Sequence, residues 1–256
     1  DGMDPHQRPL RMQGAVGHQA VQRPCVAPKA LAHMLGIARL GNGAAAHEDE
    51  NFLHRDRYDH SVSMAVSIEQ ALALNAVTPT DLDHVELYSC FPCIPKMARR
   101  LIDWPADRPA SVFGGLTFGG GPIGNYMSHA GVRMVHRLRA DAGTGLLFAN
   151  GGYATHNHSI VVSSQPIPAA SFPRSHDFQA QAAAARGPIP DLDKDYAGPA
   201  TVETFTVFYG RDGQPRAGVV VALTPAGKRV LAQVPGNDAA MIERLTSAEG
   251  TPVGAS

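Results

Sequence analysis

The sequence predicts an α/β protein in which helices and strands are layered, followed by a small β-rich domain. Between residues 51 and 165, helical periodicities alternate with short apolar runs typical of buried strands. From residue 201 to 256, alternating β-branched and aromatic residues are separated by turn signals. Residues 166–200 between these two parts are rich in Pro and Ala, which is typical of a linker.

The layered part is expected to begin with a helix over 61–75, capped by Asp59 or Ser61. A short strand over 84–87 and a helix over 92–102 follow, with Pro92 at the start of that helix. The remaining elements expected here are a helix over 127–138 and buried strands over 145–149 and 159–163.

The first fifty residues are heavily punctuated by Pro and Gly, and only residues 27–40 show helical spacing. We interpret residues 1–50 as an irregular remnant of a preceding region and expect the chain to be a fragment. The C-terminal part, in contrast, reads as a compact OB-like barrel with strands over 201–209, 218–223 and 229–234 and a helix over 238–246.

Composition argues against a nucleic-acid-binding protein and against a membrane-spanning one. The net charge is -1 over 256 residues, which gives no basic surface for nucleic acid. No apolar run reaches the roughly 20 residues of a membrane span. The three cysteines are sparse and odd in number, so we expect a reducing, cytoplasmic location without disulfides.

The run from Gly114 to Tyr126 is the most informative segment, because dense glycine allows positive φ and close approach of a ligand. It contains Gly119-x-Gly121-x-x-Gly124, formally a dinucleotide fingerprint, but Pro122 lies inside the turn and no second βαβ unit follows. A glycine-rich core crossing without a ligand is the plain alternative.

Histidines and cysteines raise two further possibilities. Two groups of residues could bind a metal: His156-x-His158 on one strand face, and the acidic stretch that contains His47 and His54. Hydrogen-bonded or surface histidines are the simpler interpretation of both. The Cys90-x-x-Cys93 pair stands where a strand meets a helix, so Cys90 is a candidate nucleophile or a small buried residue. We expect no metal.

Three segments taken together resemble the C-terminal half of the thiolase superfamily, in its sterol-carrier-thiolase-like branch. The segment ending in Tyr88-Ser89-Cys90-Phe91 is similar to the His-Asp-Cys-Phe segment of that branch. The residues Gly114-Gly115-Leu116 and Gly120-Gly121-Pro122-Ile123-Gly124 resemble its Gly-Gly-Leu and Gly-His-Pro-x-Gly. Ala149-Asn150-Gly151-Gly152 falls where thiolases carry Cys-x-Gly-Gly. The β-rich domain is similar to the extra C-terminal domain of thiolase-like proteins of acetyl-CoA acetyltransferase type.

The resemblance implies a layered αβα thiolase fold and acyl transfer between coenzyme A thioesters in lipid metabolism. The departures are at the working positions: Gly121 replaces the histidine, Ala149 replaces the late cysteine, and Tyr88 replaces the Asn or His of the oxyanion hole. Glycine and alanine side chains transfer no proton.

The hypothesis is therefore a thiolase-like, acyl-CoA-associated protein that is degenerate at the usual catalytic positions, and the alternative is a non-catalytic module that binds acyl-CoA or a partner. The candidate catalytic residues, among which Cys90 would be the nucleophile and His158 its base, are Tyr88, Ser89, Cys90, Asn150 and His158. The residues expected to border the coenzyme A thioester are Gly114, Gly115, Gly120, Gly121, Pro122, Gly124, Asn125, Gly151 and Gly152.

Two other readings stay open. The nucleophilic cysteine of the family belongs to its N-terminal half, and Cys25 resembles it only loosely because Ala27 stands where a Ser is expected. A homodimer or a separate N-terminal thiolase half is the expected protein partner. Nucleic-acid binding by the β-rich domain would use Phe205, Phe208 and Tyr209 as stacking groups, but alternate strand positions are more simply explained as core.

Overall fold

The computed structural model describes residues 39–48, 51–88, 90–165 and 175–256. In the first part of the chain the elements are β1 (Arg39–His47), α2 (Val62–Ala73), the 3-10 turn η1 (Pro79–Asp81), β2 (His84–Tyr88), α3 (Cys93–Leu101), α4 (Leu116–Gly119), the 3-10 turn η2 (Ile123–Asn125), α5 (Tyr126–Asp141), β3 (Thr144–Gly151) and β4 (His156–Ser163). In the second part they are α6 (Gln179–Ala185), β5 (Thr201–Tyr209), β6 (Pro215–Leu223), β7 (Arg229–Pro235) and α7 (Ala239–Thr246). None of these described helices is long and apolar enough to cross a membrane.

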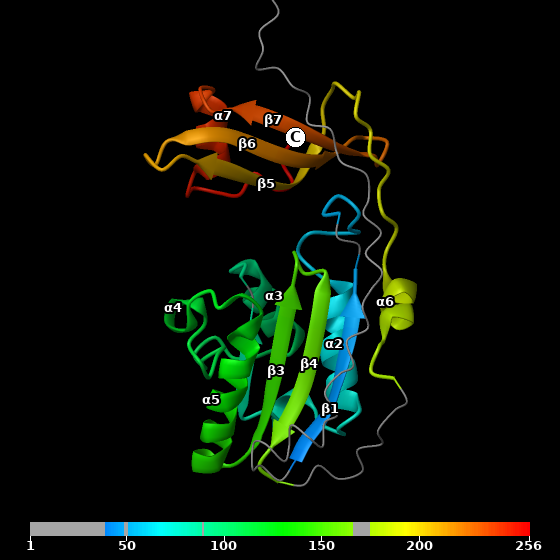
Figure 1. Ribbon diagram of the computed structural model, residues 1–256. Helices are drawn as coiled ribbons and strands as arrows, with labels where there is room; N and C mark the ends of the chain where they lie inside the picture. Colours follow the sequence, from blue (N-terminus) through cyan, green and yellow to red (C-terminus); the bar gives the residue numbers. More distant parts are fainter. Residues whose placement is uncertain (1–38, 49–50, 89, 166–174) are drawn as a thin grey trace, which may run out of the picture.

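A four-stranded mixed sheet organises the first part, in the order β1-β4-β3-β2. Strands β2 and β3 are parallel, whereas β4 runs antiparallel to both β3 and β1. Helices α2 and α3 cover one face of the sheet and α5 lies on the other (Figure 1). The predicted layered α/β class is thereby confirmed.

The main core lies between the sheet and α2. Residues of β2 and β3 that alternate toward this side, such as Leu87 and Phe148, pack with Met64 and Ile68 of α2, and all four are almost fully buried. Ser61 caps α2 as predicted, its hydroxyl accepting a hydrogen bond from the N–H of Met64. The first two turns of α2 are buried on nearly all sides, because the sheet covers one side of the helix and α6 another.

Strand β1 differs from the sequence expectation, which placed an irregular stretch there. Asn42 is fully buried, and its N–H donates to Asn75 Oδ1 at 2.7 Å while Asn75 Nδ2 donates to Asn42 O at 2.9 Å. The free edge of β1 is covered as well, because the N–H of Ala45 donates to His176 O and the N–H of Phe178 donates to Ala45 O. These partners are distant in sequence, so local spacing carries no sign of the strand. The helical spacing over 27–40 lies outside the described residues except for residues 39 and 40, which belong to β1.

Part of the expected linker is also ordered against the layered domain. Helix α6 places Ala182 against Ala46, Val62 and Val66, so the chain between the two sheets is anchored along α2. Further on, β5, β6 and β7 form an antiparallel sheet in that order, with α7 packed against β5 and β6. The described sheet is open, so the predicted barrel was wrong, although its three strands and its helix are present.

One arginine joins the small sheet to the layered domain. Arg229 is fully buried, and its guanidinium binds both carboxylate oxygens of Glu203, at 2.7 and 2.9 Å. Its Nη1 donates to the carbonyl oxygens of Leu53 and Arg55, at 2.6 and 2.7 Å. The guanidinium also lies over the ring of Tyr58, and burial of that phenol raises the pKa of Tyr58 to about 12. The Arg229 guanidinium is therefore surrounded by a carboxylate, two backbone carbonyls and an aromatic ring.

We predict that Arg229→Ala lowers the free energy of unfolding by about 3–5 kcal/mol, because it leaves the Glu203 carboxylate partly buried without its counter-charge. The neighbouring Lys228→Ala is the control, since Lys228 is half exposed and lies 3.9 Å from Asp193; we expect less than about 0.5 kcal/mol there. Urea unfolding of both variants measures the difference. Equal costs would show that the Arg229 network does not stabilise the junction.

Candidate functional site

Three residues singled out from the sequence lie in one row across the sheet, near the ends of β2 and β3 and the start of β4. In the sheet register Tyr88 pairs with Ala149, and Ala149 pairs with His158 of β4. Directly opposed residues share a face of the sheet, so these three form a row on the face that carries α5. Because neighbouring strands lie about 4.8 Å apart, Tyr88 and His158 are separated by roughly 10 Å across the row.

Tyr88 has a defined setting within this row. Its ring stacks on Tyr126 with centroids 4.1 Å apart, and its hydroxyl lies 3.3 Å from Cys90 Sγ. The hydrogen bond with Cys90, followed by burial, raises the pKa of Tyr88 to about 12. The phenol is therefore neutral near pH 7, and either its O–H or the thiol S–H can donate the hydrogen bond between them.

A buried carboxylate that the sequence analysis missed holds the glycine-rich run in place. Glu86 is fully buried, and it accepts hydrogen bonds from Tyr126 Oη at 2.8 Å, Ser111 Oγ at 2.8 Å and the N–H of Phe113 at 3.0 Å. Ser111 Oγ in turn accepts from the N–H of Gly114 at 2.6 Å. Burial and the Glu86 carboxylate raise the pKa of the Tyr126 phenol. A charged residue inside an apolar strand was the signal that could have found this site.

The glycines of the loop divide into those the backbone requires and those it does not. Gly114, Gly115 and Gly120 have φ of 97°, 71° and 63°, which favours glycine. Gly121 has no such φ, and a Cβ added there would meet nothing within 4 Å. Position 121 therefore has room for a side chain. Beside it, the side chain of Ile123 is 94% exposed.

The Asn150-Gly151-Gly152 segment is arranged differently from the row. Asn150 follows Ala149 in β3, so its side chain lies on the opposite face. There it is buried, and its Nδ2 donates to Gly151 O at 3.1 Å and to Asn157 Oδ1 at 3.4 Å. The structure thus places Asn150 beside Asn157 and away from Tyr88 and His158. Gly152 has φ of 58° in the turn that leads to β4.

His158 belongs to a group of three imidazoles that the sequence did not link. The ring of His47 on β1 lies 5.0 Å from that of His156 and 5.7 Å from that of His158, centroid to centroid. Burial, His47 and His156 lower the pKa of His158, in that order. Within the described residues, no group of three or more His, Cys, Asp or Glu is arranged to hold a metal ion. His158 is therefore neutral at pH 7 and available as a proton acceptor.

The thiols have less defined settings. Cys90 and Cys93 are free and exposed, with Cys93 opening α3. Ser89, also a candidate catalytic residue, lies outside the described residues, as does Cys25.

Comparison with known proteins connects this geometry to a family. Residues 179–256 match the family model of the thiolase-like protein type 1 additional C-terminal domain. The structure is similar to a monomeric SCP2-thiolase-like protein type 1 from Mycobacterium smegmatis, with a TM-score of 0.71 and 27% sequence identity. The predicted resemblance to the thiolase superfamily is confirmed.

The extent of this similarity is limited. It covers 88% of this chain and 50% of the mycobacterial protein, so the chain spans about half the length of that relative. Human mitochondrial 3-ketoacyl-CoA thiolase, alone and in complex with CoA, is matched with 21% identity and a TM-score of 0.42, over 50% of this chain and 30% of the human one. No curated protein sequence matches the chain.

The domain model begins at residue 179, inside the stretch that the composition marks as a linker. Helix α6, which packs against α2, is therefore the first element of the additional C-terminal domain of this thiolase-like chain.

We predict that neighbouring glycines of the loop respond differently to the same substitution. Gly120→Val forces a β-branched residue to positive φ and should lower the free energy of unfolding by about 1–2 kcal/mol. Gly121→Val should change it by less than about 0.5 kcal/mol, because that position is open and has an ordinary φ. Thermal unfolding followed by circular dichroism measures both; a larger loss at Gly121 would contradict the loop geometry described here.

Proposed function

We propose that this thiolase-like chain binds an acyl-CoA thioester at the ends of β2 and β3 and lacks the usual proton-transfer groups for Claisen chemistry. The proposal rests on the row of Tyr88, Ala149 and His158 and on the open position at Gly121 in the loop that leads to α5. Two positions where the family uses a histidine and a cysteine carry no titratable side chain. Binding is therefore better supported than carbon–carbon bond formation or cleavage.

The loop that starts at Gly114 supports the binding half of the proposal. Glu86 and Ser111 fix its first residues, and three glycines at positive φ keep its backbone free of Cβ atoms. Such a backbone lets an extended, partly polar chain approach closely and exchange hydrogen bonds with it. The pantetheine arm of coenzyme A has that character. Within this proposal Pro122, Gly124 and Asn125 border the arm from the start of α5, and Gly151 and Gly152 border the thioester.

The mycobacterial relative contains a portion that this chain does not match. The chain spans about half of its mycobacterial relative, and the fold of that relative includes a further portion. We propose that acyl transfer, where it occurs, requires that other portion, from the same polypeptide or from a second one. The relative is described as monomeric, which favours the same polypeptide over a homodimer.

Calorimetry with acetyl-CoA and octanoyl-CoA tests the binding proposal. We expect saturable binding of at least one thioester, and no thiolysis or condensation product in the same preparation. Gly121→Glu should weaken binding about tenfold or more, roughly 1.4 kcal/mol, because its carboxylate would occupy the loop and repel the coenzyme A phosphates. Gly250→Glu is the matched control, since Gly250 is equally open and lies in the C-terminal domain. Absence of binding by both thioesters would contradict the proposal.

A second candidate function is covalent acyl transfer through Cys90. The observation that favours it is the Tyr88 hydroxyl at 3.3 Å from Cys90 Sγ, because a neutral phenol that donates a hydrogen bond stabilises a thiolate. His158 would be the base in this hypothesis. Tyr88 and His158 are two strands apart in the sheet, roughly 10 Å, so a proton would travel from Cys90 to His158 through water.

Alkylation separates Cys90 from Cys93. With bromoacetyl-CoA, we expect mass spectrometry to find the label on Cys90 in the wild type and an at least fivefold lower total labelling rate in Cys90→Ala. Cys93→Ala, which removes an equally exposed thiol, should retain the wild-type rate. Equal labelling of Cys90→Ala and the wild type would contradict the nucleophile hypothesis. The binding proposal would be unaffected by that result.

A further inference from the structure

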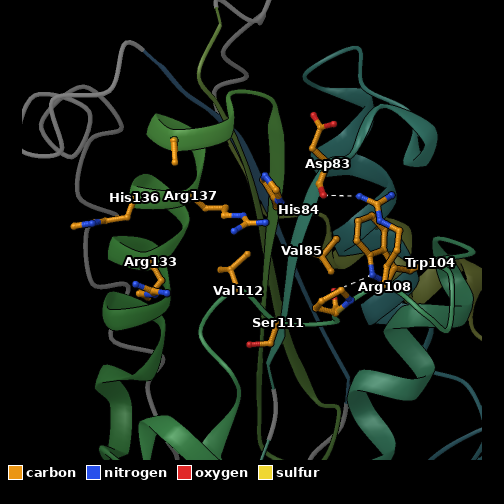
Figure 2. A pocket seen from close by; sticks show the side chains of 12 residues that line it. Asp83, His84, Val85, Trp104, Arg108, Ser111, Val112, Arg133, His136 and Arg137 are labelled. Carbon is orange, nitrogen blue, oxygen red and sulfur yellow. Dashed lines mark hydrogen bonds between the residues drawn. The ribbon is translucent and has the colours of Figure 1, made fainter.

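A cavity lies at the start of β2, at the end of this strand away from Tyr88. It is a cavity of about 570 Å³ between β2, α5 and the segment 104–112. His84 and Val85 of β2 form its floor, Arg133 and Arg137 of α5 form one wall, and Arg108 with Trp104 forms the other (Figure 2). Its volume falls within the roughly 300–1,000 Å³ typical of small-molecule sites.

Positive charge dominates the lining. Three arginines face the cavity, whereas Asp83 is the one carboxylate among its lining residues. Asp83 is already engaged, because its Oδ2 accepts a hydrogen bond from the N–H of Thr144 at 2.9 Å. Arg137 forms an ion pair with Asp141 through its Nε, at 2.9 Å. That contact leaves the terminal nitrogens of Arg137 directed toward His84 (Figure 2).

Arg108 is held in position before any ligand arrives. Its guanidinium lies 3.8 Å from the centroid of the Trp104 ring. Its Nη2 donates to the carbonyl oxygens of Leu82 and Asp83, and Trp104 Nε1 donates to Pro109 O at 3.0 Å. A guanidinium fixed in this way loses little conformational entropy when it binds an anion, and its remaining N–H groups stay available.

The floor of the cavity contains an unsatisfied polar atom. His84 Nε2 is buried and has no hydrogen-bond partner among the described residues. Burial and the nearby Arg137 lower the pKa of His84, while Asp83 and Asp141 oppose that shift. An anion placed between Arg137 and Arg108 would supply Nε2 with a hydrogen-bond acceptor and offset both effects that disfavour its protonation.

We propose that this cavity binds a small molecule through a phosphate group, held between the guanidinium groups of Arg137 and Arg108 beside the imidazole of His84, while Arg133 adds positive charge to the same wall. Planar guanidinium groups match phosphate oxygens in bidentate geometry, and a dianion suits three arginines better than a single carboxylate would. The site is separate from the proposed acyl-CoA site, because His84 and Tyr88 stand at opposite ends of β2.

The single tryptophan of the chain gives a direct readout, because Trp104 lies in the cavity wall. We would titrate the full chain at constant ionic strength with inorganic phosphate, ribose 5-phosphate and succinate, and follow tryptophan fluorescence. The expected result is a saturable change with a phosphate compound, at least tenfold tighter than with succinate. Tighter binding of the ester would identify an organic phosphate as the ligand class, and equal binding would identify the phosphate ion itself.

Charge-matched variants decide whether the cavity is responsible. Arg137→Gln should weaken phosphate binding at least tenfold, whereas Arg139→Gln, on the same helix but outside the lining, should leave it within twofold. Circular dichroism checks that both variants remain folded, and Arg133→Gln replaces Arg137→Gln if the latter does not fold. Equal weakening by the Arg139 substitution, equal affinity for succinate, or a response that never saturates would each overturn the proposal. Acetyl-CoA is left out of these titrations, so failure here leaves the acyl-CoA proposal untouched.

Discussion

The ion pair between Glu48 and Arg55 is the interaction on which the rest of the structure depends. Both side chains are almost fully excluded from water, with Arg55 Nη2 3.0 Å from Glu48 Oε2. The other carboxylate oxygen of Glu48 accepts hydrogen bonds from two serines at the start of α2, and Arg55 Nη1 donates to Tyr153 O at 2.8 Å. A buried charge that loses its partner is strongly destabilising, so the end of β1, the start of α2 and the turn between β3 and β4 are held as one unit.

The same ion pair connects the additional C-terminal domain to the candidate site. Arg229 donates to the carbonyl oxygens of Leu53 and Arg55, in the segment that Glu48 fixes. The small sheet is thereby seated above the ends of β2 and β3, the edge where Tyr88 and Gly152 lie (Figure 1). The guanidinium of Arg55 contacts the carbonyl of Tyr153, directly after Gly152. Arg229 and Arg55 therefore connect the C-terminal domain, through direct hydrogen bonds, to the turn between β3 and β4.

How far the sequence predicts this structure depends on how local the stabilising contacts are. Helix α2 was predictable because its apolar spacing and the Ser61 cap lie within a few turns of one another, and β2 and β3 were predictable from their apolar runs. Strand β1 was not, because the Asn42–Asn75 hydrogen bonds and the pairing with residues 176–178 join distant segments. In the site, the glycine loop was found from its composition, but the face of Asn150 and the grouping of His47 with His158 depend on register. Strand register depends on the hydrophobic pattern and the connecting turns of both paired strands together, and β1 and β4 are far apart in the sequence.

The differences from the thiolase motifs noted in the sequence are differences in side chains. They do not alter the loop backbone that would contact a ligand in the proposed function. In the proposed function, Gly121 and Ala149 are the two positions without a proton-transfer group, and neither takes part in the hydrogen bonds that Glu86 and Ser111 make at the start of the loop. Those contacts come from Glu86, Ser111 and Tyr126, which lie beneath the loop and do not need the missing side chains. Because Glu86 is buried and fully engaged, its loss would be costly whether or not the protein performs chemistry. In the proposed function, therefore, the residues that would hold the thioester are separate from the positions that lack a proton-transfer group.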